Sequence, residues 1–123
     1  MIKAKGYYIQ EQQWLFGKRV LIIDASHQGS VIVDITDKKI SPHAECDAYI
    51  WNLWVNADAR GNGIGGKLLE LAECIADSFN CQNVGLSWNR KEAPVWVFDW
   101  YVKQEYAEVS FDDYGEIFLR KDL

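Results

Sequence analysis

With 123 residues, of which 49% are hydrophobic and 14% aromatic, the chain has enough apolar side chains for one core and too few residues for several domains. Its 13 basic and 18 acidic residues give a net charge of −5, which argues against nucleic-acid binding and favours a cationic partner. No apolar run reaches the length of a membrane span, and the first residues lack a secretory signal. We expect residues 1–123 to form a single cytoplasmic domain with no membrane partner.

The three cysteines, Cys46, Cys74 and Cys81, are irregularly spaced and contain no C-x-x-C pair. They are too few for a disulfide framework and do not match a structural zinc site. We expect reduced thiols at these positions.

The first half of the chain has the composition of β-strands. Aromatic and β-branched residues gather in runs between turn signals, and Gly17–Lys18 and Gln28–Ser30 are predicted hairpin turns. Residues 36–48 are predicted as a polar loop that contains Pro42. These features predict a meander of strands before the first helix. The predicted strands are residues 7–16, 19–25, 31–35 and 49–55.

The second half alternates helices and strands. Apolar residues recur at helical spacing and predict an amphipathic helix from about Gly65 to Asn80. Pro94 fits the first turn of a second helix at 94–104. One crossover helix predicts an α+β (α/β) fold with a mixed central sheet and two main helices. Further strands are predicted at 83–88, 106–111 and 116–121, the last two joined by a turn at 112–115.

The connection before the first predicted helix, 58-DARGNGIGGKLLEL-71, fits three phosphate-binding patterns. Residues 61–66 match G-x-G-x-x-G, the dinucleotide pattern. Residues 61–67 match G-x-x-x-x-G-K, most of a nucleotide-triphosphate loop. Residues 60–65 match R-x-x-G-x-G. At most one of these patterns can describe the fold.

The first two patterns each lack a required side chain. A triphosphate loop needs Ser or Thr directly after its lysine to hold magnesium, and position 68 is leucine. A dinucleotide fold needs an acid about twenty residues after the glycines, and Gly85–Trp88 contains none. A glycine-rich turn without a ligand is the simpler hypothesis. Glycines at a helix start lower helix stability, however, which favours a backbone that a ligand approaches closely.

The third pattern extends beyond the glycines. The run 53-LWVNADARGNGIGGKLLE-70 resembles the acetyl-coenzyme A (acetyl-CoA) site of the GNAT N-acetyltransferases, and 100-WYVKQEY-106 resembles the family's second helix. The resemblance covers residues 49–123. Residues 1–48 match only as strands, and the two helices that normally follow the family's first strand are missing. The resemblance implies a compact GNAT-like fold, acetyl-CoA as co-substrate without a metal, and direct acetyl transfer to a primary amine.

The resemblance also implies a set of site residues. Free N–H groups at the helix start would cradle the pyrophosphate of CoA. The preceding strand would offer its backbone to pantetheine and the thioester, with the Val55 amide on the acetyl carbonyl. Tyr101 matches the tyrosine that protonates the leaving thiolate, and Asn89 replaces an asparagine contact because Pro94 occupies its usual position. The implied CoA-binding residues are Leu53, Trp54, Val55, Arg60, Gly61, Asn62, Gly63, Ile64, Gly65, Gly66 and Asn89.

The general base is less clearly specified. Where some family members carry a catalytic glutamate, this chain has Tyr49. Glu45 is the first substitute, acting through water, with Asp47 and Asn52 as alternatives. His43, Glu45 and Asp47 alternate as metal ligands can, but no second ligand pair follows, so we expect no metal there.

The acceptor is predicted only by class. Acidity favours a small cationic amine or a lysine-bearing peptide. The tryptophans at 51, 54, 88, 96 and 100 are expected mainly in the core, with one or two lining an acceptor pocket or a homodimer face. Two other hypotheses stay open: a GNAT-like acyl-CoA-binding or regulatory module without catalysis, and an interaction protein that uses the fold as a scaffold.

Overall fold

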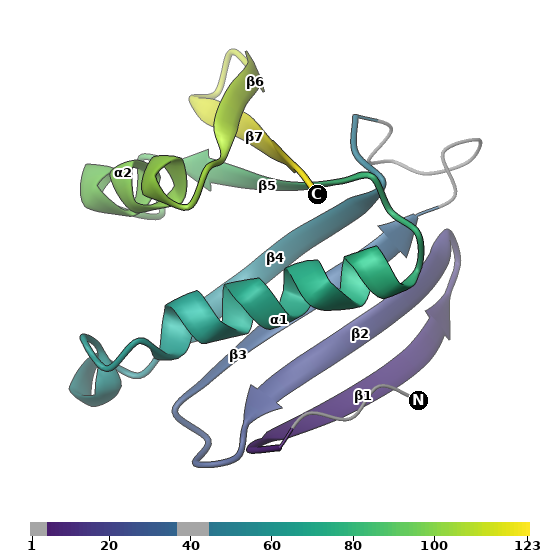
Figure 1. Cartoon of the computed structure of the whole chain (residues 1–123). Coiled ribbons are helices and arrows are strands. Elements are labelled where there is room, and N and C mark those ends of the chain that lie inside the picture. Colours follow the sequence, from purple (N-terminus) through teal and green to yellow (C-terminus); the bar gives the residue numbers. More distant parts are fainter. Residues whose placement is uncertain (1–4, 37–44) are drawn as a thin grey trace.

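The computed structural model describes residues 5–36 and 45–123, which form one seven-stranded sheet with two α-helices (Figure 1). The strand order across the sheet is β1-β2-β3-β4-β5-β7-β6. In chain order the elements are β1 (Tyr7–Trp14), β2 (Gly17–Asp24), β3 (Gly29–Thr36), β4 (Ala48–Val55), a short 3-10 helix η1 (Ala57–Ala59), α1 (Ile64–Ser78), β5 (Asn83–Asn89), α2 (Val95–Lys103), β6 (Ala107–Phe111) and β7 (Glu116–Asp122).

The sheet is mixed. β1 to β4 form an antiparallel meander, and β4 and β5 are parallel. β7 lies between β5 and β6 and pairs with both in the antiparallel sense. A parallel pair needs a crossover connection, and α1 provides it. This arrangement confirms the predicted mixed α+β sheet with its N-terminal meander.

β1 and β2 are joined by Leu15 and Phe16 alone, and Trp14 pairs directly with Gly17. No helix therefore lies between the first two strands of the described chain. The predicted turn at Gly17–Lys18 is wrong because both residues belong to β2. Glycine is favoured at position 17 for two reasons: its φ is 144°, and a β-carbon there would lie 2.1 Å from the carbonyl oxygen of Ile35 on β3.

The second predicted turn, at Gln28–Ser30, is displaced in the same way. The chain reverses just before it, where the Asp24 carboxylate accepts hydrogen bonds from the backbone N–H groups of Ser26 and Gln28 at 3.2 and 3.4 Å. Gly29 already begins β3. A β-carbon there would lie 2.8 Å from the carbonyl oxygen of Trp54, so this glycine also marks close packing between strands.

The core lies between α1 and the face of the sheet that α1 covers (Figure 1). Alternate residues of β2 to β4 point to this face, as the period of a strand requires. Each buried Leu or Ile side chain stabilises the fold by roughly 1.5–3 kcal/mol. The predicted amphipathic helix is confirmed, with bounds Ile64–Ser78. The facing sets, all 2% exposed or less, are Val20, Ile22, Val31, Val33, Ala48 and Ile50 on the strands and Leu68, Leu69, Ala72, Ile75 and Ala76 on α1.

The second predicted helix is also confirmed, with Pro94 as the residue that precedes it. Trp88 of β5 fixes its position, because the indole Nε1 donates to the Pro94 carbonyl at 3.2 Å and the ring packs edge-on against Phe98 at 5.3 Å. α2 therefore lies at the carboxyl end of β5, beside the start of α1 (Figure 1). None of the described helices is long and apolar enough to cross a membrane.

Candidate functional site

β4 and β5 pair at their first residues and then diverge. The pair of diverging strands is here called the fork, with its closed end at the paired residues and its open end toward Val55 and Asn89. Their parallel pairing joins Ala48 to Val84 and Tyr49 to Gly85, and no later residues of the two strands pair in the described chain. Asn52 has a φ of 55° at an irregularity where the β3–β4 register shifts, and such a bulge bends its strand. α1 begins a few residues after β4 ends, so its first turn lies at the open end of the fork.

The first turn of α1 has backbone N–H groups that no described residue accepts from. Gly63 is the N-cap, in a left-handed conformation with a φ of 79°, and offers no side-chain cap. The Lys67 N–H donates to the Gly63 carbonyl at 3.1 Å, which begins the helical ladder. The N–H groups of Ile64, Gly65 and Gly66 donate to no residue of the described chain, and the turn contains no acid. Such a helix start attracts anions.

The glycines keep the front of this turn open. A β-carbon built at Gly61, Gly63 or Gly66 would meet nothing within 4 Å. Gly61 and Gly63 also have positive φ values of 89° and 79°, which favour glycine. A bulky group can therefore approach the backbone here without displacing side chains.

The residues flanking the glycines have distinct surroundings. The Arg60 side chain is exposed, and its Nε donates to the Val55 carbonyl at 3.2 Å. Asn62 is exposed. Leu68, which replaces the magnesium-binding hydroxyl of a triphosphate loop, is fully buried in the core. Arg60 is thus a cation within reach of any anion at the loop.

β4 presents backbone groups to the fork. The Asn56 N–H donates to the Gln28 carbonyl at 2.7 Å, on the β3 side of the chain. Because successive N–H groups of an extended strand point to opposite edges, the Val55 N–H points toward the β5 side. Leu53 packs against the core, whereas Trp54 is 47% exposed. Of the three predicted strand residues, Val55 thus directs its backbone N–H to the fork, whereas Trp54 pairs with Ser30 of β3.

Tyr101 of α2 lies between two other aromatic rings. Its ring centroid is 5.5 Å from that of Trp100 and 6.2 Å from that of Tyr106. Burial raises the pKa of the Tyr101 phenol, and the nearby Tyr49 phenol raises it further. No group in the described chain is hydrogen-bonded to the Tyr101 hydroxyl. Within the described residues, the Tyr101 hydroxyl is therefore left with its hydrogen-bonding capacity unused.

Polar contacts of Glu73 on α1 join it to Tyr106, which follows α2, and to Lys121 of β7. The Tyr106 hydroxyl donates to Glu73 Oε2 at 2.7 Å, and Lys121 Nζ donates to Glu73 Oε1 at 3.0 Å. Tyr106 is only 2% exposed, and burial raises the pKa of its phenol. This contact fixes the ring against which Tyr101 packs.

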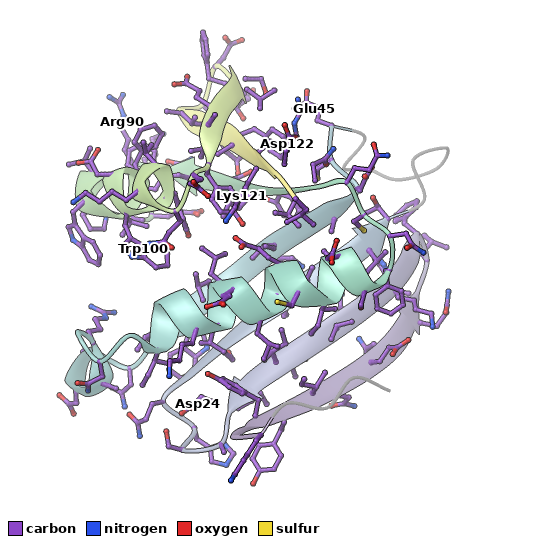
Figure 2. The ribbon with its side chains drawn as sticks, in the orientation of Figure 1. Asp24, Glu45, Arg90, Trp100, Lys121 and Asp122 are labelled. Atoms are coloured by element: carbon purple, nitrogen blue, oxygen red, sulfur yellow. The ribbon has the colours of Figure 1, made fainter. Side chains whose placement is uncertain are left out.

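The predicted base, Glu45, lies away from the fork opening. It is exposed and accepts a hydrogen bond from Ser110 Oγ at 3.1 Å. Figure 2 shows Glu45 at the end of the sheet where β5 begins, and Trp100 on α2, beyond the other end of β5. The structure therefore does not bring Glu45 together with Tyr101, which follows Trp100 on α2.

The alternative bases are placed elsewhere too. The Asp47 carboxylate accepts from the Gln82 N–H at 2.7 Å, at the closed end of the fork. Asn52 is an exposed bulge residue. His43 lies outside the described residues. Within residues 5–36 and 45–123, no three His, Cys, Asp or Glu side chains gather in a way that could hold a metal ion.

Asn89 ends β5 at the fork opening. Its Oδ1 accepts from the Lys91 N–H at 2.9 Å, and its carbonyl accepts from the N–H groups of Glu92 and Ala93. The side chain thus shapes the turn into α2 while remaining half-buried. Its predicted contact with CoA stays a prediction.

The sequence did not reveal one polar pair at the fork. The Tyr49 hydroxyl donates to Ser87 Oγ at 2.9 Å, from β4 to β5. Tyr49 stacks on Phe118 with ring centroids 6.5 Å apart, and burial raises the pKa of its phenol. Ser87 lies 38 residues from Tyr49 along the chain, so no local pattern connects the two. The one sequence signal is that Tyr49 occupies the position where a catalytic glutamate is expected.

Comparisons with known proteins agree with this geometry. The family model described as "Acetyltransferase (GNAT) family" matches residues 6–97. No curated protein sequence gives a significant match. A GNAT-family acetyltransferase from Staphylococcus aureus is 16% identical, with a TM-score of 0.65, over 86% of this chain and 67% of its own.

Two similar structures contain CoA. The PaiA N-acetyltransferase from Thermoplasma acidophilum, solved with coenzyme A, has a TM-score of 0.67 at 17% identity over 85% of this chain and 60% of its own. A chain of the NatC complex, bound to Gag peptide and CoA, has a TM-score of 0.63 at 18% identity over 85% of this chain and 70% of its own. At these identities the likeness shows the fold.

Proposed function

Because the chain belongs to the GNAT family of acetyltransferases, we propose that it transfers an acetyl group from acetyl-CoA to a primary amine in a ternary complex. The observation that carries this proposal is the glycine-capped start of α1 at the open end of the β4–β5 fork, beside Tyr101 on α2. The free N–H groups and open glycines there fit a pyrophosphate that must come close to the backbone.

The cradle would be residues 60–66. The N–H groups of the first turn would bind the pyrophosphate oxygens, and Arg60 would add a positive charge beside them. Ile64 contributes its backbone N–H and packs its side chain against the core. Anion binding of this type needs no divalent metal, so we expect turnover to persist in EDTA.

β4 would hold the acyl end. The backbone of residues 53–55 would pair with pantetheine, which is an extended chain with amide groups. The Val55 N–H, directed to the fork, would stabilise the negative charge that develops on the acetyl oxygen as the amine attacks. Oxyanion donors of this kind typically contribute about 3 kcal/mol to transition-state stabilisation.

Tyr101 would donate a proton to the departing sulfur. A phenol whose pKa is raised stays protonated over the neutral range, and it is not engaged by any described group. General acids in such positions accelerate reactions by roughly 10²–10⁴-fold. Protonating the sulfur as it leaves lowers its tendency to attack the new amide.

The acceptor is proposed as a small cationic amine or a lysine-bearing peptide. The net charge of −5 supports a cationic partner, since the protein surface attracts it at a distance. The three free cysteines support action in a reducing, cytoplasmic setting.

The main alternative is an acyl-CoA-binding or regulatory module without catalysis. The two-residue connection between β1 and β2 favours it. In the described chain no helix follows β1, so the helices that would cover part of the sheet beside the acceptor site are missing there. The test is acetyl-CoA turnover against a panel of polyamines, aminoglycosides and lysine peptides, followed by mass spectrometry of the acceptors. Acetylated product supports the transferase. Tight acetyl-CoA binding with no product from any amine would support the alternative.

A further inference from the structure

The fork has two faces, and they carry different chemistry. The first face, toward α1 and α2, holds Tyr101. The opposite face, here called the helix-free face, is covered by neither described α-helix. Side chains of a strand alternate between faces, and Leu86 and Trp88 of β5 pack into the core on the helix side. Ser87 between them therefore points to the helix-free face.

Tyr49 reaches the same face from β4. Its neighbours Ala48 and Ile50 are buried against α1, so Tyr49 points the other way. Tyr49 is also the last residue of β4 that pairs with β5. On β5 the last paired residue is Gly85, and Ser87 lies two positions beyond it. The hydroxyl bond of 2.9 Å thus bridges the strands where backbone pairing has stopped, at the apex of the fork.

The direction of the Tyr49–Ser87 hydrogen bond decides which hydroxyl proton stays available. Tyr49 donates, so Ser87 Oγ uses one of its two lone pairs and keeps its own proton. Among the described residues, no group accepts the Ser87 proton. Stacking on Phe118 and burial hold the Tyr49 ring in place, and its raised pKa keeps the phenol a donor.

We propose that Ser87 contacts the attacking amine and relays its proton to water, and that Tyr49 is the positioning residue that orients the Ser87 hydroxyl. The inference deepens the proposed function and depends on it. It assigns acid and relay to opposite faces of the fork, with Tyr101 on one face and Ser87 on the other.

The proton balance is complete. The amine nitrogen lone pair forms the N–C bond to the acetyl carbon, and the C–S bond breaks with its electron pair on sulfur. The nitrogen loses one proton to Ser87 Oγ while the Ser87 hydroxyl proton passes to water. Tyr101 gives its proton to sulfur and regains one from solvent.

Glu116 adds charge to the same face. It is exposed at the start of β7, pairs with Asn89, and its carboxylate raises the pKa of Tyr49, after the larger effect of burial. A carboxylate near the apex favours the approach of a cationic amine. This agrees with an acceptor that arrives as an ammonium ion, releases one proton to bulk water to become the neutral nucleophile, and loses the second proton through Ser87 as the N–C bond forms.

The test uses Ser87→Ala, Ser87→Thr, Tyr49→Phe and the double variant, with kcat and KM for the amine identified by the panel. We expect Ser87→Ala to lower kcat about 100-fold, with acetyl-CoA affinity and melting temperature unchanged, and Ser87→Thr to restore most of it. Tyr49→Phe should lower kcat about 10-fold alone and cause no further loss in the Ser87→Ala background, because it acts through Ser87.

Ser110→Ala is the matched control, since its hydroxyl also donates across the fold, but to the exposed Glu45. It should retain wild-type kcat. Wild-type kcat in Ser87→Ala, with the chemical step rate-limiting, would overturn the inference and leave the proposed function standing. Equal losses from Tyr49→Phe in both backgrounds would overturn the role of Tyr49. A wild-type protein that acetylates no amine would overturn the proposed function and this inference together.

Discussion

Gly65 and Trp100 bring the first turn of α1 to the side of α2. A β-carbon at Gly65 would lie 3.9 Å from Cη2 of Trp100 and 3.4 Å from a methyl carbon of Val55. Residues far apart in the sequence thus meet where the helix start, the end of β4 and α2 converge. This contact brings the proposed phosphate cradle next to the helix that carries the proposed acid.

Gly66→Val tests the cradle. The position is helical and open, so valine should fold without a clash while its branches crowd the exposed N–H groups. We expect acetyl-CoA affinity to fall about 10-fold or more by calorimetry, with a melting temperature near wild type. Glu70→Val, one turn later on an exposed position of α1, is the control and should bind normally. Unchanged affinity in folded Gly66→Val would remove the cradle from the mechanism.

Tyr101→Phe tests the acid. The ring keeps its packing against Trp100 and Tyr106, so acetyl-CoA affinity and thermal stability should barely change. We expect kcat to fall roughly 10²–10⁴-fold. Because burial raises the Tyr101 pKa, the phenol stays protonated up to at least its usual value, about 10. The wild-type kcat should therefore show no loss from Tyr101 ionisation below that pH; a Tyr101-dependent fall near pH 8 would contradict the raised pKa.

Asp34→Ala tests a buried ion pair on the helix-free face. The carboxylate, 1% exposed, accepts from Arg19 Nε and Nη2 at 2.7 and 2.9 Å and from Trp51 Nε1 at 2.9 Å. Removing it leaves the Arg19 guanidinium between the Trp14 and Trp51 rings without its counter-charge. We expect a loss of roughly 3 kcal/mol in the free energy of unfolding, measured with urea.

Lys18→Ala is the control for that variant, because the Lys18–Glu11 pair is on the surface. Its loss should stay below about 1 kcal/mol. Equal effects from the two substitutions would show that the buried pair contributes no more than an exposed one.

Thiol labelling tests the packing around the cysteines. Cys46 and Cys81 are buried and Cys74 is exposed. Burial raises the pKa of Cys46 to about 12, so at pH 8 almost none of it is the reactive thiolate. We expect rapid labelling of Cys74 alone in the native protein and of all three after unfolding in urea. Fast native labelling of Cys46 would show that the closed end of the fork is open to solvent.

The sequence predicted what depends on local pattern. Runs of aromatic and β-branched residues between turn signals predicted the strands. The spacing from Leu68 to Phe79 predicted α1, because one buried face imposes its period on the residues that form it. The misplaced turns had a different cause. Gly17 and Gly29 are glycines because a neighbouring strand comes close, and the pattern of one strand does not contain that contact.

The candidate site divides in the same way. The glycine loop is contiguous in the chain, so its geometry at the start of α1 could be predicted. The Tyr49–Ser87 bond joins residues 38 positions apart, and only the register of the parallel β4–β5 pair brings them together. The closeness of Glu45 to β4 in the sequence predicts a place at the site, but its carboxylate accepts a hydrogen bond from Ser110 of β6, away from the fork opening.

The most direct test of the account is to follow backbone amide shifts by ¹H–¹⁵N NMR as acetyl-CoA is added to the wild-type protein. We expect the largest shifts on Val55 and on residues 61–66, with smaller ones on α2 around Tyr101 and none in β1. Large shifts confined to β1 and β2, or no shifts at millimolar acetyl-CoA, would contradict the placement of the acyl donor in the fork between β4 and β5.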